Sequence, residues 1–287
     1  MTPNIASQYD STKIISHNNR SLQDIDLSAH KEKLQNATNL ALSLDQELEI
    51  LQELSTFELG KFLLVNKGLN GYWTSYIILH GLQKTQISPL EKWILTSAPT
   101  VLATRERFYI FQNSLQKYLN SNSTIASIPC GTMDDLTSLD TESFHNIHYV
   151  GIDYDNTSLE LAKQNSAPCK KVSVHFQKKD AWNLDSPSQF TIVTSNGLNI
   201  YEADDNKVID LYKSFYHSLQ EGGILITSFL TPPPSLSPES PWKNYNPNDL
   251  LKQKAVFLDI IDANWQAFRT ETQTRIQLQK AGFTHIH

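Results

Sequence analysis

The sequence predicts an α/β protein in which a doubly wound, mostly parallel sheet follows an all-helical N-terminal region. After residue 120, five short runs of β-branched and aromatic residues alternate with helix-like segments, as in consecutive βαβ units. These runs are apolar without clean alternation, which is typical of strands covered on both faces. Before residue 120 the apolar residues recur at helical spacing. We therefore place an arm and helical cap at 1–120 and the sheet domain at 121–287.

Length and composition favour a cytoplasmic protein with a small-molecule substrate. The chain has no run of 18 apolar residues and no basic-then-apolar leader, so we expect neither a membrane partner nor secretion. The formal net charge of −6 offers no global attraction to phosphate backbones, so no nucleic-acid partner is expected. Two cysteines, Cys130 and Cys169, are too few for a disulfide framework, which indicates a reducing compartment. The oligomeric state stays open.

The first 120 residues divide into a polar and an amphipathic part. Residues 1–28 are rich in Ser, Asn and Gln, and we expect a loosely attached arm there. Leucines spaced by three, four and seven predict one or two amphipathic helices over 28–64. Pro89 and Pro99 each favour the first turn of a further helix, the second of which reaches Leu119.

Residues 121–287 carry the predicted sheet. Strands are expected over 124–128, 149–153, 172–176, 190–195 and 223–229, with a further strand beginning at 283. Helices are expected over 134–139, 158–164, 207–219 and 251–280. The proline-rich residues after the fifth strand predict an insertion at about 230–265 on the substrate side, because ligands bind beyond the carboxyl ends of such strands.

Two residues at predicted strand ends point to a nucleotide site. Gly131 follows the first strand, where a backbone without a side chain lets a ligand approach the turn. Asp153 ends the second strand, 22 positions later, where a carboxylate can accept hydrogen bonds from both hydroxyls of a ribose.

At these residues the chain resembles the class I S-adenosylmethionine-dependent methyltransferases, with a Rossmann-like, seven-stranded-type sheet. Residues 127–133, Ser-Ile-Pro-Cys-Gly-Thr-Met, resemble the first-strand motif of that family. Further matches follow in the family's order at 150–153, 179–182, 190–198, 219–225 and 281–283. The resemblance covers about 124–287, and the chain stops where the sixth strand of the family begins.

Two positions depart from the first motif of the family. Ser127 stands where the family has an acid, and Met133 stands where it has a glycine. A carboxylate is therefore missing where the methionine amino group of the cofactor is normally held, and Asp134 or Asp135 could compensate.

The resemblance implies S-adenosyl-L-methionine as the cofactor. The histidines show no ligand spacing such as His-x-x-x-His, so no metal is expected. The expected cofactor-binding residues are Tyr72, Arg107, Ser127, Pro129, Cys130, Gly131, Asp153, Tyr154, Asp180, Ala181, Trp182, Ser195 and Asn196. The catalytic candidates are Ser195, Asn196 and Tyr201. The substrate-binding candidates are Trp73, Tyr76, Trp242, Trp265 and Arg269.

Several of these residues have a second interpretation. Arg107 could pair with the cofactor carboxylate or lie on a solvated helix face. Tyr72, Trp73 and Tyr76 could close over a ligand or pack inside the cap. Cys130 follows the first strand, unlike the nucleophile of cytosine-C5 methyltransferases, which follows the fourth, so we favour a cofactor-loop role.

The sequence therefore predicts a methyltransferase that acts on an oxygen or nitrogen atom of a small-molecule acceptor. Methylation of a protein or a tRNA is the first alternative. A catalytically silent member that uses the fold for binding is the second, because Ser127 and Met133 alter the first motif.

Overall fold

The computed structural model describes residues 25–287 except 235 and 266, so the predicted arm lies almost wholly outside the described residues. The chain forms two compact units. The helical unit comprises Met1–Glu106 and Asn244–Asn264, and the sheet unit comprises Arg107–Lys243 and Trp265–His287. In the part of the chain that is described, no helix is long and apolar enough to cross a membrane.

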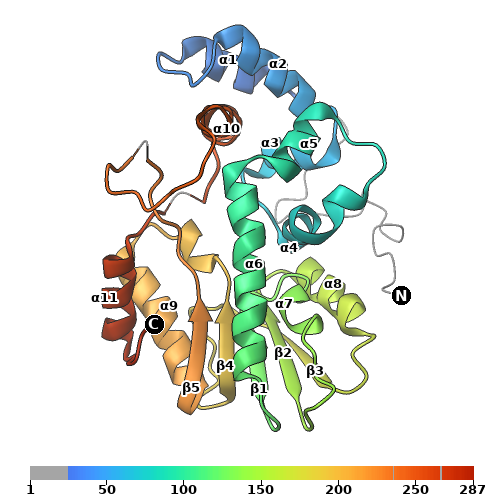
Figure 1. The fold of residues 1–287 in the computed structure, drawn as a ribbon, viewed down its shortest axis with the longest axis vertical. Coiled ribbons are helices and arrows are strands. Elements are labelled where there is room, and N and C mark those ends of the chain that lie inside the picture. Colours follow the sequence, from blue (N-terminus) through green and yellow to red (C-terminus); the bar gives the residue numbers. More distant parts are fainter. Residues whose placement is uncertain (1–24, 235, 266) are drawn as a thin grey trace. The chain divides into compact units, whose positions relative to one another are not determined.

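The sheet unit contains five parallel strands (Figure 1). They are β1 (Thr124–Ser127), β2 (His148–Asp153), β3 (Ser173–Lys178), β4 (Phe190–Ser195) and β5 (Leu219–Thr227). Their spatial order is β3-β2-β1-β4-β5, so the strand order reverses between β1 and β4. The predicted doubly wound α/β class is confirmed, and the reversal marks the edge at which such sheets bind ligands.

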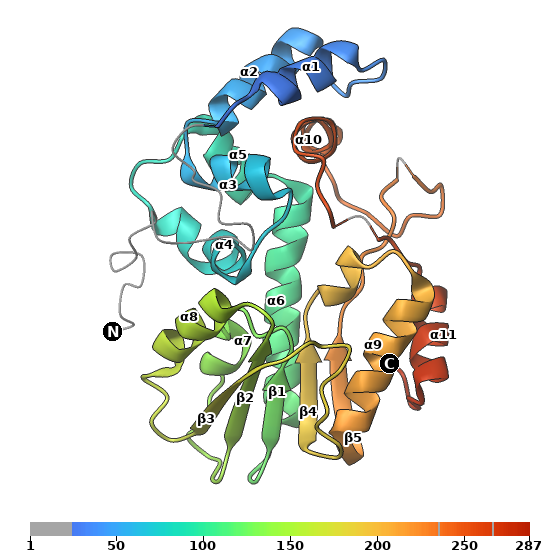
Figure 2. The same ribbon diagram turned by 180° about the vertical axis from the view of Figure 1, so that it is seen from behind.

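Helices cover both faces of this sheet. Ile125 and Tyr149 face a core formed with α7 (Asp134–Thr137), α8 (Asn156–Ser166) and the end of α6 (Pro99–Tyr118). Ala126 and Val150, one residue further along each strand, face a second core formed with α9 (Asp205–Ser218) and α11 (Glu271–Ala281). Figure 2 shows α9 and α11 side by side next to β5. This two-sided burial explains the apolar strands without alternation.

The helical unit is built as its proline and leucine patterns predict. Its helices before α6 are α1 (Ser28–Asn36), α2 (Leu44–Leu54), α3 (Glu58–Asn66), α4 (Gly71–Ser75) and α5 (Pro89–Thr96), with a π-helix at Tyr76–His80 and a 3-10 turn at Gly81–Gln83. Ser43 starts α2 with a capping box. Pro89 occupies the first turn of α5, where the missing N–H has no intrahelical partner to lose.

The prediction of one helix over 251–280 is wrong. The chain forms α10 (Pro247–Lys254) and a π-helix at Ala255–Ile260, then an irregular stretch, and then α11. The irregular stretch is held by other elements: the N–H of Asn264 donates to Lys67, and the N–H of Arg269 donates to Leu230. These hydrogen bonds to residues distant in the sequence interrupt the helix that the periodicity of 251–280 predicts.

The predicted insertion also divides between the two units. Asn244–Asn264 packs with the helical unit, where Trp93 Nε1 donates to Asp249 at 2.7 Å and the N–H of Ala41 donates to Asp259 at 2.8 Å. The boundary near residue 120 likewise differs from the observed one, which falls inside α6 between Glu106 and Arg107. Because α6 is one continuous helix, nothing in its sequence marks that boundary.

The predicted strand beginning at 283 is also wrong. Gly282 ends α11 with a φ of 110°, and residues 283–287 form no strand. Instead Phe283 packs edge-on against Tyr216 of α9, and Arg275 of α11 donates to the carbonyl of Ile286. The sheet therefore has five strands within the described residues, rather than the seven of the expected type.

Candidate functional site

The loop that follows β1 is held between the two strands that flank β1. The N–H of Ile128 donates to the carbonyl of Thr194 in β4 at 2.9 Å, and the N–H of Cys130 donates to Ile152 in β2 at 2.8 Å. The peptide bond between Ile128 and Pro129 is cis. The two hydrogen bonds fix the backbone of the loop at the point where the strand order reverses.

Asp153 joins the loop to the end of β2. Its Oδ2 accepts a hydrogen bond from the N–H of Gly131 at 3.0 Å, and its Oδ1 accepts one from the N–H of Asp155 at 2.9 Å. Gly131 has a φ of 51°, a conformation that glycine adopts without strain. The two residues that the sequence pairs at a distance of 22 positions are thus in direct contact.

Met133 occupies the position where the sequence lacks an expected glycine. Its backbone adopts the left-handed conformation, with a φ of 60°, and its side chain is buried in the core under α7. Asn165 of α8 supports this turn by donating to the carbonyl of Thr132 at 2.9 Å. A methionine therefore makes the turn of a glycine while its side chain adds to the core.

Asp135 brings a carboxylate to the serine that stands at the end of β1. The hydroxyl of Ser127 donates to Asp135 Oδ2 at 2.9 Å, and the N–H of Leu136 donates to Oδ1 at 3.0 Å. Both side chains are buried. Burial raises the pKa of Asp135 to about 6, while the bonds from Ser127 and Leu136 oppose that rise. Of the two acids that could compensate for Ser127, Asp135 is the one in contact with it.

Cys130 is a buried thiol rather than an exposed nucleophile. Its sulfur lies close to Gly151 of β2, where an added β-carbon would approach it to 3.2 Å. Burial, followed by the charges of Asp153 and Asp135, raises the pKa of Cys130 above its ordinary value. Because the thiolate is the reactive form, this environment disfavours nucleophilic chemistry.

The residues after β4 form the other side of the reversal point. Ser195 is buried, and Asn196 accepts a hydrogen bond from the hydroxyl of Ser228 at 3.3 Å. Gly197 turns the chain with a φ of 90° into the short 3-10 helix Leu198–Tyr201. The guanidinium of Arg107, from α6, lies against Gly197.

The comparisons with known proteins agree with this geometry. The sequence profile of a methyltransferase domain matches residues 119–271, more than half of the chain. The chain belongs to the methyltransferase domain family. No curated protein sequence matches it.

Three solved structures show different degrees of similarity to this chain. A possible exported protein from Bordetella parapertussis is 41% identical, with a TM-score of 0.83, over 89% of this chain and 86% of that one. A candidate O-methyltransferase from Nostoc punctiforme is 16% identical, with a TM-score of 0.48, over 82% and 66%. Phosphoethanolamine N-methyltransferase 2 of Haemonchus contortus, in complex with S-adenosyl-L-methionine, is 14% identical, with a TM-score of 0.43, over 63% and 37%.

The chain is thus a methyltransferase with the Rossmann-like fold of the class I family, as its motifs predict. The residues at the strand ends fit the cofactor that this family implies. A carboxylate and a glycine turn suit a ribose, and a buried carboxylate beside Ser127 suits an ammonium group. No cluster of His, Cys, Asp and Glu suited to a metal ion occurs among residues 25–287 as described.

The predicted adenine-side residues lie beyond β2 and β3. Tyr154 is 70% exposed, with the ammonium of Lys178 over its ring. Asp180 accepts a hydrogen bond from the N–H of Trp182 at 3.0 Å, and Trp182 Nε1 donates to the carbonyl of Lys207. Ala181 packs beside Trp182 at the edge of the core. Their roles toward a cofactor stay predictions.

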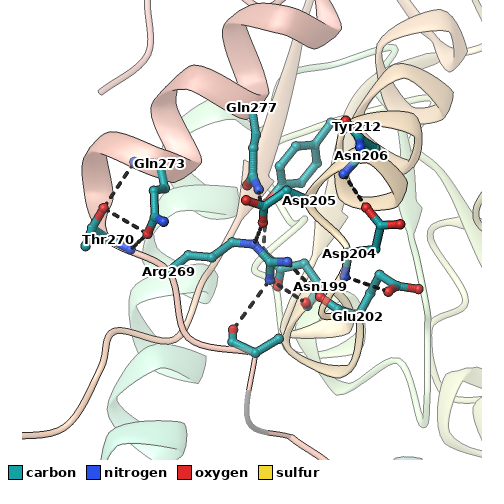
Figure 3. A network of polar contacts seen from close by, with 11 residues as sticks. Asn199, Glu202, Asp204, Asp205, Asn206, Tyr212, Arg269, Thr270, Gln273 and Gln277 are labelled. Carbon is teal, nitrogen blue, oxygen red and sulfur yellow. Dashed lines mark hydrogen bonds and ion pairs between the residues drawn. The ribbon is translucent and has the colours of Figure 1, made fainter. Parts of the chain in front are cut away.

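Arg269 forms a polar network with the segment after β4 (Figure 3). Its Nε donates to Asp205 at 3.0 Å, and its two terminal nitrogens donate to the carbonyls of Asn199 at 3.1 Å and Glu202 at 2.7 Å. The side chain is 3% exposed, and Gln277 shares Asp205. Every nitrogen of the predicted substrate residue is therefore engaged within the chain, which makes it a support for the 3-10 helix Leu198–Tyr201.

The other predicted ligand residues pack within their own units. Trp73 is buried among aromatic rings that include Tyr72 and Tyr76, and the Tyr76 hydroxyl donates to Glu91 at 2.6 Å. In the sheet unit, Trp242 Nε1 donates to the hydroxyl of Thr231, and Trp265 precedes the Arg269 segment. A ligand role for these residues stays a prediction.

Sequence reasoning missed Asn165, because no motif marks its bond to a turn 33 residues away.

Proposed function

We propose that the chain uses S-adenosyl-L-methionine to methylate an oxygen or nitrogen atom of a small-molecule acceptor. The observation that carries this proposal is the contact of Asp153 with Gly131 at the reversal point of the sheet. It joins a carboxylate suited to a ribose with a turn that a ligand can approach closely.

Each strand end has a part in this proposal. Asp153 would bind the ribose, Ser127 and Asp135 would hold the amino group, and Ser195 and Asn196 would border the reacting centre. When bound, the cofactor supplies an electrophilic methyl group on a sulfonium. The contribution of the chain is to orient the acceptor and exclude water, since such transfers depend chiefly on proximity. Tyr201 stays a candidate for proton transfer.

The net charge supports a small acceptor over a nucleic acid. The chain has 24 Lys and Arg against 30 Asp and Glu, so it offers no overall attraction to phosphate backbones. Incubating the protein with methyl-labelled cofactor and a cell extract, followed by size fractionation, tests this. We expect label in the small-molecule fraction. Label in protein or RNA would favour the alternatives, and a bound cofactor without any transfer would favour a silent binding protein.

Cofactor binding itself is tested by calorimetry with S-adenosylmethionine and S-adenosylhomocysteine. We expect Asp153→Ala to weaken both by about tenfold or more, because a charged hydrogen-bond partner of the ribose is lost. Asp210→Ala removes an exposed acid of α9 and serves as the matched control. No binding by the wild type, or equal binding by Asp153→Ala, would count against the proposal.

A cytoplasmic location belongs to the same proposal. Cys130 and Cys169 are both free thiols, as a reducing compartment favours. The Bordetella parapertussis relative is described as a possible exported protein, which is the competing expectation. Fractionation of cells that carry an epitope-tagged chain distinguishes the two, and recovery outside the cytoplasm would overturn this part.

A further inference from the structure

Arg107 carries a positive charge that the described chain does not pair. Its side chain is half-buried and its Nε is fully buried without a hydrogen-bond partner. None of the ion pairs among the described residues includes it. Burial lowers the pKa of its guanidinium, and the one ionisable group that opposes this is the phenol of Tyr201. An unpaired charge in such a place is costly, so it points to a ligand.

Arg105, two residues earlier on the same helix, shows that α6 can satisfy an arginine internally. Its guanidinium donates to the carbonyls of Ile77 at 2.7 Å, Leu95 at 2.9 Å and Ile78 at 3.3 Å. Arg105 therefore has a structural role that Arg107 lacks. The contrast gives a matched control for any experiment on Arg107.

The guanidinium of Arg107 lies against the segment that follows β4, which the proposed function places beside the reacting centre. A β-carbon built on Gly197 would lie 3.3 Å from Nη2 and 3.4 Å from Nη1, so the guanidinium covers the backbone directly after Ser195 and Asn196. The proposed function places the ribose at β2 and the amino group at β1. Arg107 instead lies against Gly197, at the start of the 3-10 helix that ends at Tyr201.

From this position we propose that Arg107 binds a carboxylate of the methyl acceptor, so that the acceptor is a small organic acid. The planar guanidinium matches a carboxylate through two parallel hydrogen bonds, and such pairs are strong where water is largely excluded. The inference rests on the proposed function for the placement of the cofactor. The cofactor carboxylate is the alternative source of the same chemistry, and the test separates the two.

The first test compares acids with their neutral amides. Acetate and acetamide, hexanoate and hexanamide, and benzoate and benzamide are titrated against the full chain with saturating S-adenosylhomocysteine. We expect the wild type to bind at least one acid about tenfold more tightly than its amide. In Arg107→Gln, the affinities for that acid and its amide should differ by no more than about twofold. Arg105→Gln should keep the preference of the wild type for the acid. No preference in the wild type, or a preference that survives Arg107→Gln, overturns the proposal.

The second test identifies the source of the carboxylate. S-adenosylmethionine and decarboxylated S-adenosylmethionine differ only in the carboxylate, and their affinities are compared in the wild type and Arg107→Gln. We expect the ratio of affinities to be the same in both proteins. A preference for S-adenosylmethionine that Arg107→Gln abolishes would assign the guanidinium to the cofactor and overturn the acceptor assignment.

Folding is controlled independently of these measurements. Because Arg107 makes no hydrogen bond within the described chain and its unpaired charge is costly, Arg107→Gln should keep or raise the melting temperature of the wild type. A marked fall would show a structural role and overturn the proposal. Arg107→Lys keeps the charge without the planar fork and should give an intermediate preference. If the wild type fails to bind S-adenosylhomocysteine, the proposed function fails. The comparison of acids with their amides can then be made in the absence of S-adenosylhomocysteine, and it still tests Arg107.

Discussion

Asp135 is charged at neutral pH in a place that disfavours charge. Its pKa of about 6 lies roughly two units above that of an exposed aspartate, which corresponds to a cost of about 3 kcal/mol for the ionised form. The hydroxyl of Ser127 and the N–H of Leu136 reduce this cost without removing it. A buried carboxylate with unused acceptor capacity is suited to an ammonium group, such as the one the proposed cofactor carries.

The pH dependence of stability follows from the direction of this shift. The folded state binds the proton of Asp135 more tightly than the unfolded state does, so the penalty is absent below about pH 4. It grows from about pH 4 to pH 6 and is constant above. Asp135→Asn removes the ionisation. We therefore expect the free energy of unfolding of the variant, relative to wild type, to become more favourable by about 3 kcal/mol between pH 4 and pH 8.

Urea unfolding at several pH values measures this difference. Asp210→Asn is the control, because Asp210 is exposed on α9 and should give a difference that barely changes with pH. If the difference in the free energy of unfolding between Asp135→Asn and wild type is the same at pH 4 and pH 8, the raised pKa of Asp135 is contradicted.

Removing the Asp135 carboxylate, or moving it to position 127, tests whether it contributes to cofactor binding. We expect Asp135→Asn to weaken S-adenosylhomocysteine binding at pH 8 by about tenfold, because the ammonium group loses its charged partner. The double variant Ser127→Asp/Asp135→Asn places a carboxylate at the end of β1 and should recover most of that loss. Equal binding by wild type and Asp135→Asn would show that Asp135 serves the fold alone.

At the scale of single residues, the sequence predicts the contact that matters most. The spacing of Gly131 and Asp153 predicts that both lie at one nucleotide site, and the structure adds a hydrogen bond between them. The sequence leaves two features of the site undecided. The left-handed backbone of Met133 is set by the turn rather than by residue type, and the choice of Asp135 over Asp134 depends on which of two adjacent side chains points inward. Both are decided by packing, which sequence spacing does not encode.

At the scale of elements, Arg269 links three segments that are distant in sequence. Its side chain connects the 3-10 helix after β4 with the start of α9 (Figure 3). Its backbone N–H donates to the carbonyl of Leu230 after β5. This network fixes the 3-10 helix that carries Tyr201, so it acts on the site through position. Helical periodicity over 251–280 conceals it, because the bonds of Arg269 reach back 64 to 70 residues.

Removing this side chain should therefore be costly. We expect Arg269→Met to lower the free energy of unfolding by about 3 kcal/mol, because the buried carbonyl of Asn199 and its neighbours lose their donor. Urea unfolding at pH 7 gives the value. Lys213→Ala, which breaks an exposed pair with Asp210, should cost less than about 0.5 kcal/mol. A cost for Arg269→Met as small as that of Lys213→Ala would show that the network adds nothing.

At the scale of the whole molecule, the chain forms two compact units that do not follow its sequence order. Strand and helix periods anticipate the sheet, because each pattern is local. The division into units is not local, since Asn244–Asn264 joins helices that lie far earlier in the sequence. The bonded residues Trp93 and Asp249 are 156 positions apart, and Ala41 and Asp259 are 218 positions apart. Only tertiary contacts reveal that the segment after β5 returns to the helical unit.

This division predicts that damage to one compact unit stays within that unit. Asp249→Ala removes the acceptor of Trp93 Nε1 and should cost about 1–2 kcal/mol, because the indole N–H is left without its partner. In hydrogen exchange followed by mass spectrometry, we expect faster exchange in α5 and α10 and unchanged protection in β1, β2 and β4. Asp204→Ala removes the N-cap of α9. This variant should instead speed exchange in β1, β2 and β4 and leave the protection of α5 and α10 unchanged. Equal acceleration in both units by either variant would mean that they unfold as one, because local damage would then lower the stability of every strand and helix alike.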